Sequence, residues 1–128
     1  MIPLCADQGV GLIPWSPLAR GVLAGTRQAG TLRTRSDPFM TALYDRTQDA
    51  DERVVERVAR VAAARGAKPA SVALAWLLHR PAMTAPIVGT SKPGHLADAV
   101  AAVGITLSQE EMSALEEPYV PHAVAGHV

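Results

Sequence analysis

The 128-residue sequence has few aromatic residues, a single cysteine and no excess of charge of either sign. Because Lys plus Arg and Asp plus Glu number 12 each, the chain lacks the basic stripe that nucleic-acid binding favours. Cys5 has no partner for an internal disulfide, which fits a reducing cytoplasm. No stretch approaches the roughly 18 apolar residues of a membrane helix, and the start lacks the features of a signal peptide. We therefore expect a cytoplasmic protein without nucleic-acid or membrane partners.

An apolar run at Gly11–Ile13 predicts a short, buried parallel strand. Pro14 and Pro17 each remove a backbone donor and restrict φ, so the strand must end soon after Ile13. The stretch from Gly21 to Pro38 is polar and is expected to form a long connection.

Several residues at the carboxyl end of this strand suit a ligand. Trp15 and Ser16 lie on the stiff turn, and Arg20 and Gly21 follow it. Ligands of α/β proteins bind at the carboxyl ends of strands, and a hydroxyl, a guanidinium and a flexible glycine suit a phosphate. From the pattern alone, a buried strand followed by a proline-stiffened surface loop is the favoured interpretation.

A second strand is predicted at Ala85–Val88, followed by the turn Gly89–Lys92 and a helix that begins at Pro93. The small residues of the turn allow a ligand to approach the backbone, and the helix amino terminus attracts phosphate. Lys92 adds a positive charge.

Local signals predict four further helical stretches. Met1–Gln8 is read as the last turns of a helix stopped at Gly9. Asp49–Arg65 has apolar residues at helical spacing, with Asp49 or Asp51 as its cap and Gly66 as its stop. Pro69–Leu78 is apolar on nearly every side, so this helix should be buried. A capping box of Ser108 and Glu111 starts the last helix, which Pro118 ends.

Three aromatic or histidine positions have plain structural interpretations. Trp76 is expected to anchor the core rather than to carry a ligand. His79 is expected to interact with the last carbonyls of its helix. His122 and His127 lie in the tail without cysteine or carboxylate neighbours, so no metal site is predicted.

Three segments resemble one family. Gly11–Gly21, read as GLIPWSPLARG, resembles the seventh-strand motif of the aldo-keto reductases, in the branch that includes the potassium-channel β subunits. Ala85–Lys92, read as APIVGTSK, resembles the eighth strand, and Pro69–Leu78 resembles the helix before it. The resemblance implies one partial α/β domain over residues 1–128, the carboxyl-terminal portion of a (β/α)8 TIM barrel. Two short parallel strands with surrounding helices would not close that barrel alone.

The resemblance also implies NADP(H) as the cofactor and hydride transfer to a carbonyl as the reaction. The positions that match the family's cofactor-binding motifs are Trp15, Ser16, Pro17, Leu18, Arg20, Gly21, Arg35, Gly89, Thr90, Ser91 and Lys92. His95, Asp98 and Ala99 stand where related sequences commonly have Gln, Glu and Asn, which leaves the preference for NADP over NAD open.

No catalytic residue is carried over. The family's catalytic tyrosine and its lysine, aspartate and histidine belong to the first half of the barrel, and Tyr44 and Tyr119 lie in no matching motif. Three hypotheses follow. The chain is part of an NADPH-dependent reductase that acts on a small carbonyl substrate only when the barrel is complete. Alternatively, it is a non-catalytic subunit that completes a barrel with a separate amino-terminal half or as a homo-oligomer. The third alternative is an unstable truncated product.

Overall fold

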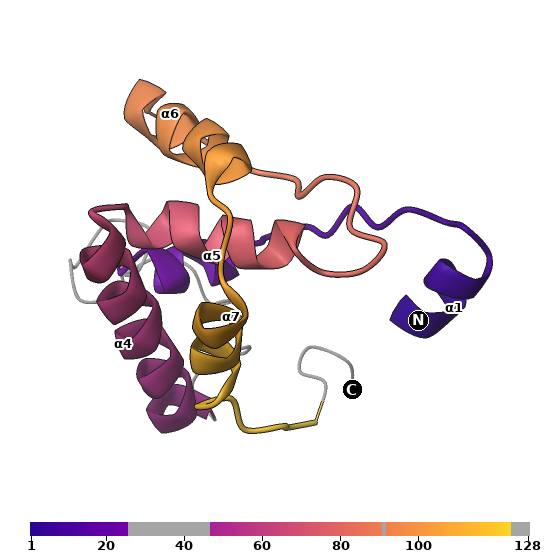
Figure 1. Cartoon of the computed structure of the whole chain (residues 1–128), viewed down its shortest axis with the longest axis horizontal. Coiled ribbons are helices and arrows are strands. Elements are labelled where there is room, and N and C mark those ends of the chain that lie inside the picture. Colours follow the sequence, from indigo (N-terminus) through magenta and orange to yellow (C-terminus); the bar gives the residue numbers. More distant parts are fainter. Residues whose placement is uncertain (26–46, 91, 124–128) are drawn as a thin grey trace.

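The computed structural model describes residues 1–25, 47–90 and 92–123. In chain order its elements are α1 (Ile2–Asp7), the 3-10 helix η1 (Ala19–Ala24), α4 (Gln48–Arg65), α5 (Pro69–Leu78), α6 (Pro93–Ala101), the 3-10 turn η4 (Ala102–Gly104) and α7 (Gln109–Glu116). η1, α4, α5 and α7 form a helical body, whereas α1 lies at the far end of the molecule and α6 extends from the body (Figure 1). Of the helices described, none is long and apolar enough to cross a membrane.

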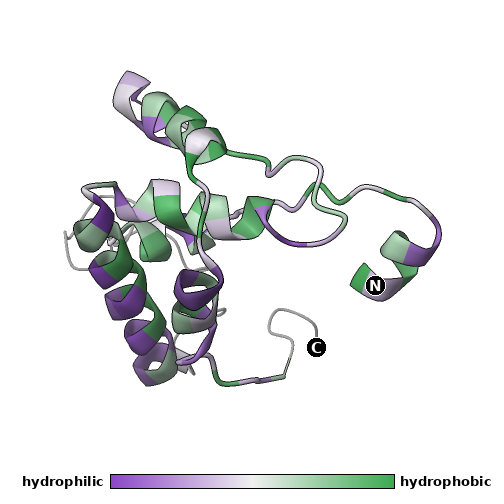
Figure 2. Ribbon diagram, in the orientation of Figure 1, coloured by the Kyte–Doolittle hydropathy of each residue, from purple (hydrophilic) through white to green (hydrophobic). Residues whose placement is uncertain are grey.

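The core lies where α4, α5 and α7 meet. Val58 and Ala62 of α4, Val72 and Leu74 of α5 and Leu115 of α7 are buried there. α5 is predominantly apolar along its length (Figure 2), and Ser71–Ala75 are all buried, as its pattern predicted. The one buried polar side chain among the described residues, Ser71, donates its hydroxyl to the Asp98 carbonyl at 2.7 Å, which ties α5 to α6.

The limits of α4 follow the sequence closely, but its amino-terminal cap does not. The helix ends at Gly66, whose φ of 63° is the left-handed conformation that glycine adopts without strain. The N-cap residue is Thr47 rather than Asp49 or Asp51. Thr47 Oγ1 donates to Asp51 Oδ2 at 2.6 Å. Asp51, one of the two predicted cap residues, thus lies in the first turn of the helix and binds the N-cap side chain.

α7 begins with the predicted capping box. Glu111 N donates to Ser108 Oγ at 3.2 Å, and Ser108 N donates to Glu111 Oε2 at 2.8 Å. The flanking Leu107 and Met112 are both buried, as a hydrophobic staple requires. The prediction that Pro118 follows the end of this helix is confirmed.

Ion pairs bind α7 to its neighbours. Each joins an arginine of α4 or of the end of α5 to a glutamate in or just after α7: Arg57–Glu117 at 2.7 Å, Arg65–Glu111 at 2.5 Å, and Arg80–Glu116. The Arg65 guanidinium donates to both oxygens of the Glu111 carboxylate and, together with the Ser108 backbone, lowers the pKa of Glu111 to about 2.

Trp76 and His79 have the structural roles that the sequence predicted. Trp76 packs against the core, its indole Nε1 donates to Glu116 Oε1 at 3.0 Å, and the Arg80 guanidinium lies 5.2 Å from its ring centroid. His79 Nδ1 lies 2.7 Å from the Ala75 carbonyl, and its Nε2 accepts from the backbone of Leu107 at 3.4 Å. His79 thus links the end of α5 to the start of α7.

The two predicted strands are replaced by two isolated parallel bridges. Leu12 pairs with Met83 and Trp15 with Ile87, and the described residues form no continuous strand. We call residues 10–16 and 82–90 the bridged segments. The prediction that they run side by side in one direction is confirmed, but the prediction that the first strand is buried is wrong. Ile13 is 61%, Trp15 64% and Ile87 54% exposed, because no described element covers them.

The pairing changes register between the two bridges. Three positions separate Leu12 from Trp15, whereas four separate Met83 from Ile87. The extra residue is accommodated around Ala85–Pro86, and a bulge suits a proline that has no N–H to donate. At the first bridge the Thr84 side chain packs closely over Gly11, so a Cβ added at Gly11 would collide with Thr84 Oγ1.

Candidate functional site

The parallel bridges bring two distant turns to the same end of the bridged segments. Leu12 N donates to Ala82 O at 2.8 Å, Thr84 N to Leu12 O at 2.9 Å, and Ile87 N to Pro14 O at 2.9 Å. Because both segments run in the same direction, the turn after Trp15 and the turn after Ile87 leave from neighbouring positions. The carboxyl ends of adjacent parallel strands are where α/β proteins bind ligands.

The first turn holds non-glycine residues in the left-handed region. Ser16 has φ of 51°, Ala19 of 49° and Arg20 of 55°, and Gly21 follows with φ of 99°. Side chains rarely adopt this conformation, at a cost of about 1–3 kcal/mol each, and such residues cluster at binding and catalytic sites. No sequence signal predicted it, because serine, alanine and arginine do not mark left-handed positions as glycine does.

Pro17 and Leu18 complete this turn and lead into η1. Both are half-buried, and Leu18 packs against the core. The prediction of a polar connection from Gly21 onward is wrong for its first residues. They belong to η1, and Val22 is only 3% exposed because η1 lies against α4 and α5. The site's first turn is therefore fixed to the helical body.

The second turn is exposed. Gly89 and Thr90 are accessible, and Lys92 occupies the N-cap position of α6 with extended backbone angles. The other two predicted residues, Arg35 and Ser91, lie outside the described residues. The structure thus brings together the segments that carry Trp15–Gly21 and Gly89–Lys92.

The charge on the two turns is of one sign. Between Gln8 and Gly25 the only charged residue in the sequence is Arg20, and between Pro81 and Ala97 it is Lys92. Two cations in segments whose sequences hold no carboxylate favour an anionic ligand such as a phosphate. The described residues contain no group of three His, Cys, Asp or Glu side chains that could hold a metal ion.

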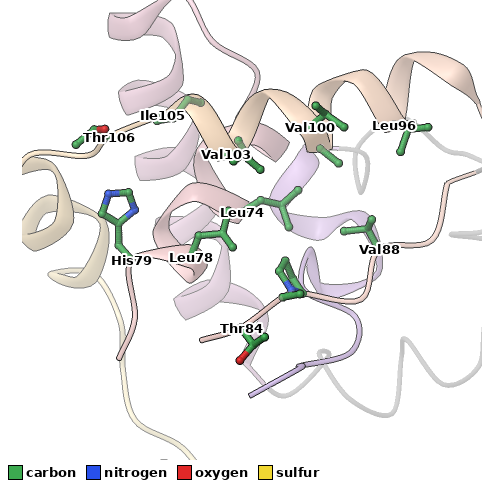
Figure 3. A pocket seen from close by; sticks show the side chains of 14 residues that line it. Leu74, Leu78, His79, Thr84, Val88, Leu96, Val100, Val103, Ile105 and Thr106 are labelled. Atoms are coloured by element: carbon green, nitrogen blue, oxygen red, sulfur yellow. The ribbon is translucent and has the colours of Figure 1, made fainter. Parts of the chain in front are cut away.

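An apolar groove lies between α5, α6 and the second bridged segment (Figure 3). It has a volume of about 610 Å³ and is lined mainly by aliphatic side chains, among them Leu74, Leu78, Val88, Val100 and Val103. Sequence reasoning did not identify it. The available signal was the spacing of Leu96, Val100 and Val103, which places three large apolar residues on one side of a helix.

Comparison with known proteins gives a consistent result. A family model described as the aldo/keto reductase family matches residues 1–119. A versiconal hemiacetal acetate reductase of Aspergillus parasiticus is 44% identical over 97% of this chain and 36% of its own length. An aldo-keto reductase of Metarhizium robertsii is 43% identical over 96% of this chain and 33% of its own length. An aldo-keto reductase of Alternaria alternata is 38% identical over 99% of this chain and 34% of its own length. The chain therefore spans about a third of the length of the curated relatives that it matches.

Proposed function

Because the chain belongs to the aldo/keto reductase family, we propose that it forms the cofactor-binding, carboxyl-terminal portion of a (β/α)8-barrel oxidoreductase. The completed enzyme transfers hydride between NADPH and a small carbonyl compound in the cytoplasm. Members of the family generally use nicotinamide cofactors, and the relatives' names describe reductases. The observation that carries the proposal is the parallel pairing of the two segments whose turns bear Ser16, Arg20 and Lys92.

Each group on the two turns has a role in this proposal. Arg20 and Lys92 provide positive charge for the phosphates of the dinucleotide, and the small residues Gly21 and Gly89 let it approach the backbone. Ser16 offers a hydroxyl on a backbone held at a φ of 51°, and a backbone that keeps its conformation when the ligand binds loses less entropy. Pro17, Leu18 and Thr90 shape the turns, and Arg35 and Ser91 complete the proposed set.

Trp15 provides a direct test of cofactor binding. Its side chain is 64% exposed at the second bridge, whereas Trp76, the other tryptophan, lies on α5 against the core. A dinucleotide on the two turns should quench the fluorescence of Trp15 more strongly than that of Trp76, which it reaches only by energy transfer to the nicotinamide. NADPH titrated into the 128-residue chain should therefore quench emission, and Trp15→Phe should remove most of that response.

Variants of the turns separate specific binding from charge attraction. Arg20→Ala should weaken NADPH binding about tenfold, the effect of losing one hydrogen bond to a charged group. Lys68→Ala, which removes an exposed cation at the start of α5, should leave the affinity unchanged. Equal effects of Arg20→Ala and Lys68→Ala, or quenching of undiminished size in Trp15→Phe, would contradict the proposed site.

We further propose that the chain alone reduces no aldehyde, since no catalytic residue is assigned to it. Oxidation of NADPH above a control without enzyme, abolished by Ser16→Ala or Ser91→Ala, would contradict this. The second candidate function, a non-catalytic subunit that completes a barrel with another polypeptide, is favoured by the exposed bridged segments. Formation of a cofactor-binding complex without turnover of any aldehyde would distinguish that subunit from an enzyme portion.

A further inference from the structure

Three consecutive residues of the first turn have positive φ. Ala19 has φ of 49°, Arg20 of 55° and Gly21 of 99°, directly after Leu18 at −104°. Residues other than glycine enter the left-handed region at a steric cost, and they do so as single residues rather than in runs. The methyl group of Ala19 has no donor or acceptor that could repay this cost by binding a ligand itself. Its conformation therefore needs another explanation.

The turn keeps this conformation because both of its ends are anchored in the helical body. Leu18 packs against the core, and Val22 is 3% exposed. Between these anchors the Gly21 amide donates to Leu18 O, and the Ala19 amide donates to Ser16 O, each at 2.9 Å. Strained backbone persists where surrounding contacts over-determine it. The reversal of the chain between Leu18 and Val22 is thus held from both sides.

An alanine at position 19 restricts the turn more than a glycine would. Glycine adopts the same φ without strain, but it also opens conformations that alanine excludes. Ala19 lies between two residues of the proposed site, since its amide binds the Ser16 carbonyl and Arg20 follows it in the chain. A site whose backbone is restricted before the ligand arrives loses less entropy on binding. The strain at Ala19 therefore accompanies a gain in preorganisation.

We propose that Ala19 is a positioning residue of the cofactor site, whose left-handed backbone keeps Ser16 and Arg20 in the arrangement that binds the dinucleotide. The inference rests on the proposed function, which assigns those two residues to the cofactor. It adds a residue that acts through its neighbours and that neither the sequence pattern nor the family resemblance singled out. The competing explanation is that the conformation serves only to direct the chain into η1.

Ala82 provides a matched control for this position. It is the other alanine with positive φ among the described residues, at 61°, and it is half-buried, as Ala19 is. Its carbonyl accepts from the Leu12 amide at the amino end of the bridged segments, whereas the proposed site lies at their carboxyl end. Ala19→Gly and Ala82→Gly remove the same methyl group from the same region of φ, so they should shift the thermal midpoint by similar amounts.

The affinity for NADPH, measured by the quenching of Trp15, should separate the two variants. Ala19→Gly should weaken binding about two- to fivefold, the factor that corresponds to the conformational freedom glycine adds. Ala82→Gly should leave the affinity unchanged. Ala19→D-Ala, made by joining a synthetic amino-terminal segment to the rest of the chain, should raise the thermal midpoint and retain the affinity. A D-residue favours positive φ and remains as restricted as alanine.

Hydrogen exchange gives a second measurement, which needs no ligand. The amides of residues 19 and 21 donate to Ser16 O and Leu18 O within the turn. Their exchange should accelerate in Ala19→Gly and stay at the parent's rate in Ala19→D-Ala. Unchanged exchange in Ala19→Gly would show that the anchors alone fix the turn, which would overturn the inference.

The binding results separate failure of this inference from failure of the proposed function. Equal NADPH affinities of the parent and Ala19→Gly would overturn the inference and leave the proposed function intact. The same conclusion follows if Ala82→Gly or Ala19→D-Ala weakens binding as much as Ala19→Gly does, because the loss would then not depend on freedom at position 19. A parent chain that binds no NADPH would contradict the proposed function itself, and the inference with it.

Discussion

The helical body and the bridged segments differ in what holds them. In the helical body, residues from α4, α5 and α7 bury one another, and ion pairs join α7 to its neighbours. In the bridged segments, a few backbone hydrogen bonds connect two stretches of chain whose side chains are largely exposed. Neither α1 nor α6 contains a buried residue. Apart from the first turn, which η1 fixes to the helical body, the part of this chain proposed to bind a ligand therefore has the least packing of its own.

Truncating one leucine in each region should show this difference most strongly. Leu74→Ala removes a side chain that is 1% exposed in the core and should lower the free energy of unfolding by about 2–5 kcal/mol. Leu96→Ala removes one that is 53% exposed on α6 and should change it by about 0.5 kcal/mol or less. Chemical denaturation monitored by circular dichroism measures both, and similar losses would refute the contrast.

The close approach at the first bridge gives the next largest effect. Gly11→Ala should separate the bridged segments and cost about 1–2 kcal/mol, because the new Cβ would meet Thr84 Oγ1 and the Thr84 side chain must rotate or move. Hydrogen exchange at the amides of Leu12 and Thr84, which form the bridge, should accelerate. Gly89→Ala is the matched control, since a Cβ added there would meet no atom within 4 Å beyond its chain neighbours. Unchanged exchange in Gly11→Ala would mean that the bridge is absent in solution.

Removing the capping box should affect only the helical body. Ser108→Ala leaves the Glu111 amide without its side-chain acceptor and should cost about 1 kcal/mol. Ser113→Ala, at an exposed position within α7, should be neutral or slightly stabilising because alanine favours helix. Urea denaturation compares the two variants, and faster amide exchange at Leu12 in Ser108→Ala would show that the two regions are coupled.

Acid should weaken the helical body through Glu111 by the smallest amount. The pKa of Glu111 is about 2 in the folded chain, below the value of about 4.3 for an unfolded glutamate. The stabilisation is therefore fully present above about pH 4.3 and is lost as the pH falls towards about 2. Glu111→Gln should be less stable than the parent at neutral pH, and this difference should shrink across that interval. A difference that stays constant from neutral pH down to pH 2 would contradict the assignment.

Sequence reasoning succeeded where structure depends on residues a few positions apart. Gly66 and Pro69 set the end of α4 and the start of α5, and Ser108 with Glu111 set the start of α7. The role of His79 followed from its place at a helix end. The error at the cap of α4 is also local. Thr47 and Asp49 compete for one helix start, and the cap preferences of threonine and aspartate scarcely differ.

It failed where structure depends on what packs against a segment. The apolar run that ends at Ile13 predicted burial, but such a run only shows that a side chain would gain from being covered. The left-handed backbone of Ser16 and Arg20 has no counterpart in residue type. The cofactor roles of the eleven proposed site residues came from family resemblance, and they stay predictions, with Arg35 and Ser91 outside the described residues.

The uneven spacing of the two bridges makes the site sensitive to chain length rather than to residue type. Had the pairing kept one offset, Trp15 would face Pro86 instead of Ile87. Deleting Ala85 would remove the extra residue, so that one offset joins both bridges and Trp15 still faces Ile87. Deleting a residue between Leu12 and Trp15 would instead widen the mismatch from one position to two. Natural variation should therefore preserve the count of residues between Leu12 and Trp15 more strictly than the count between Met83 and Ile87.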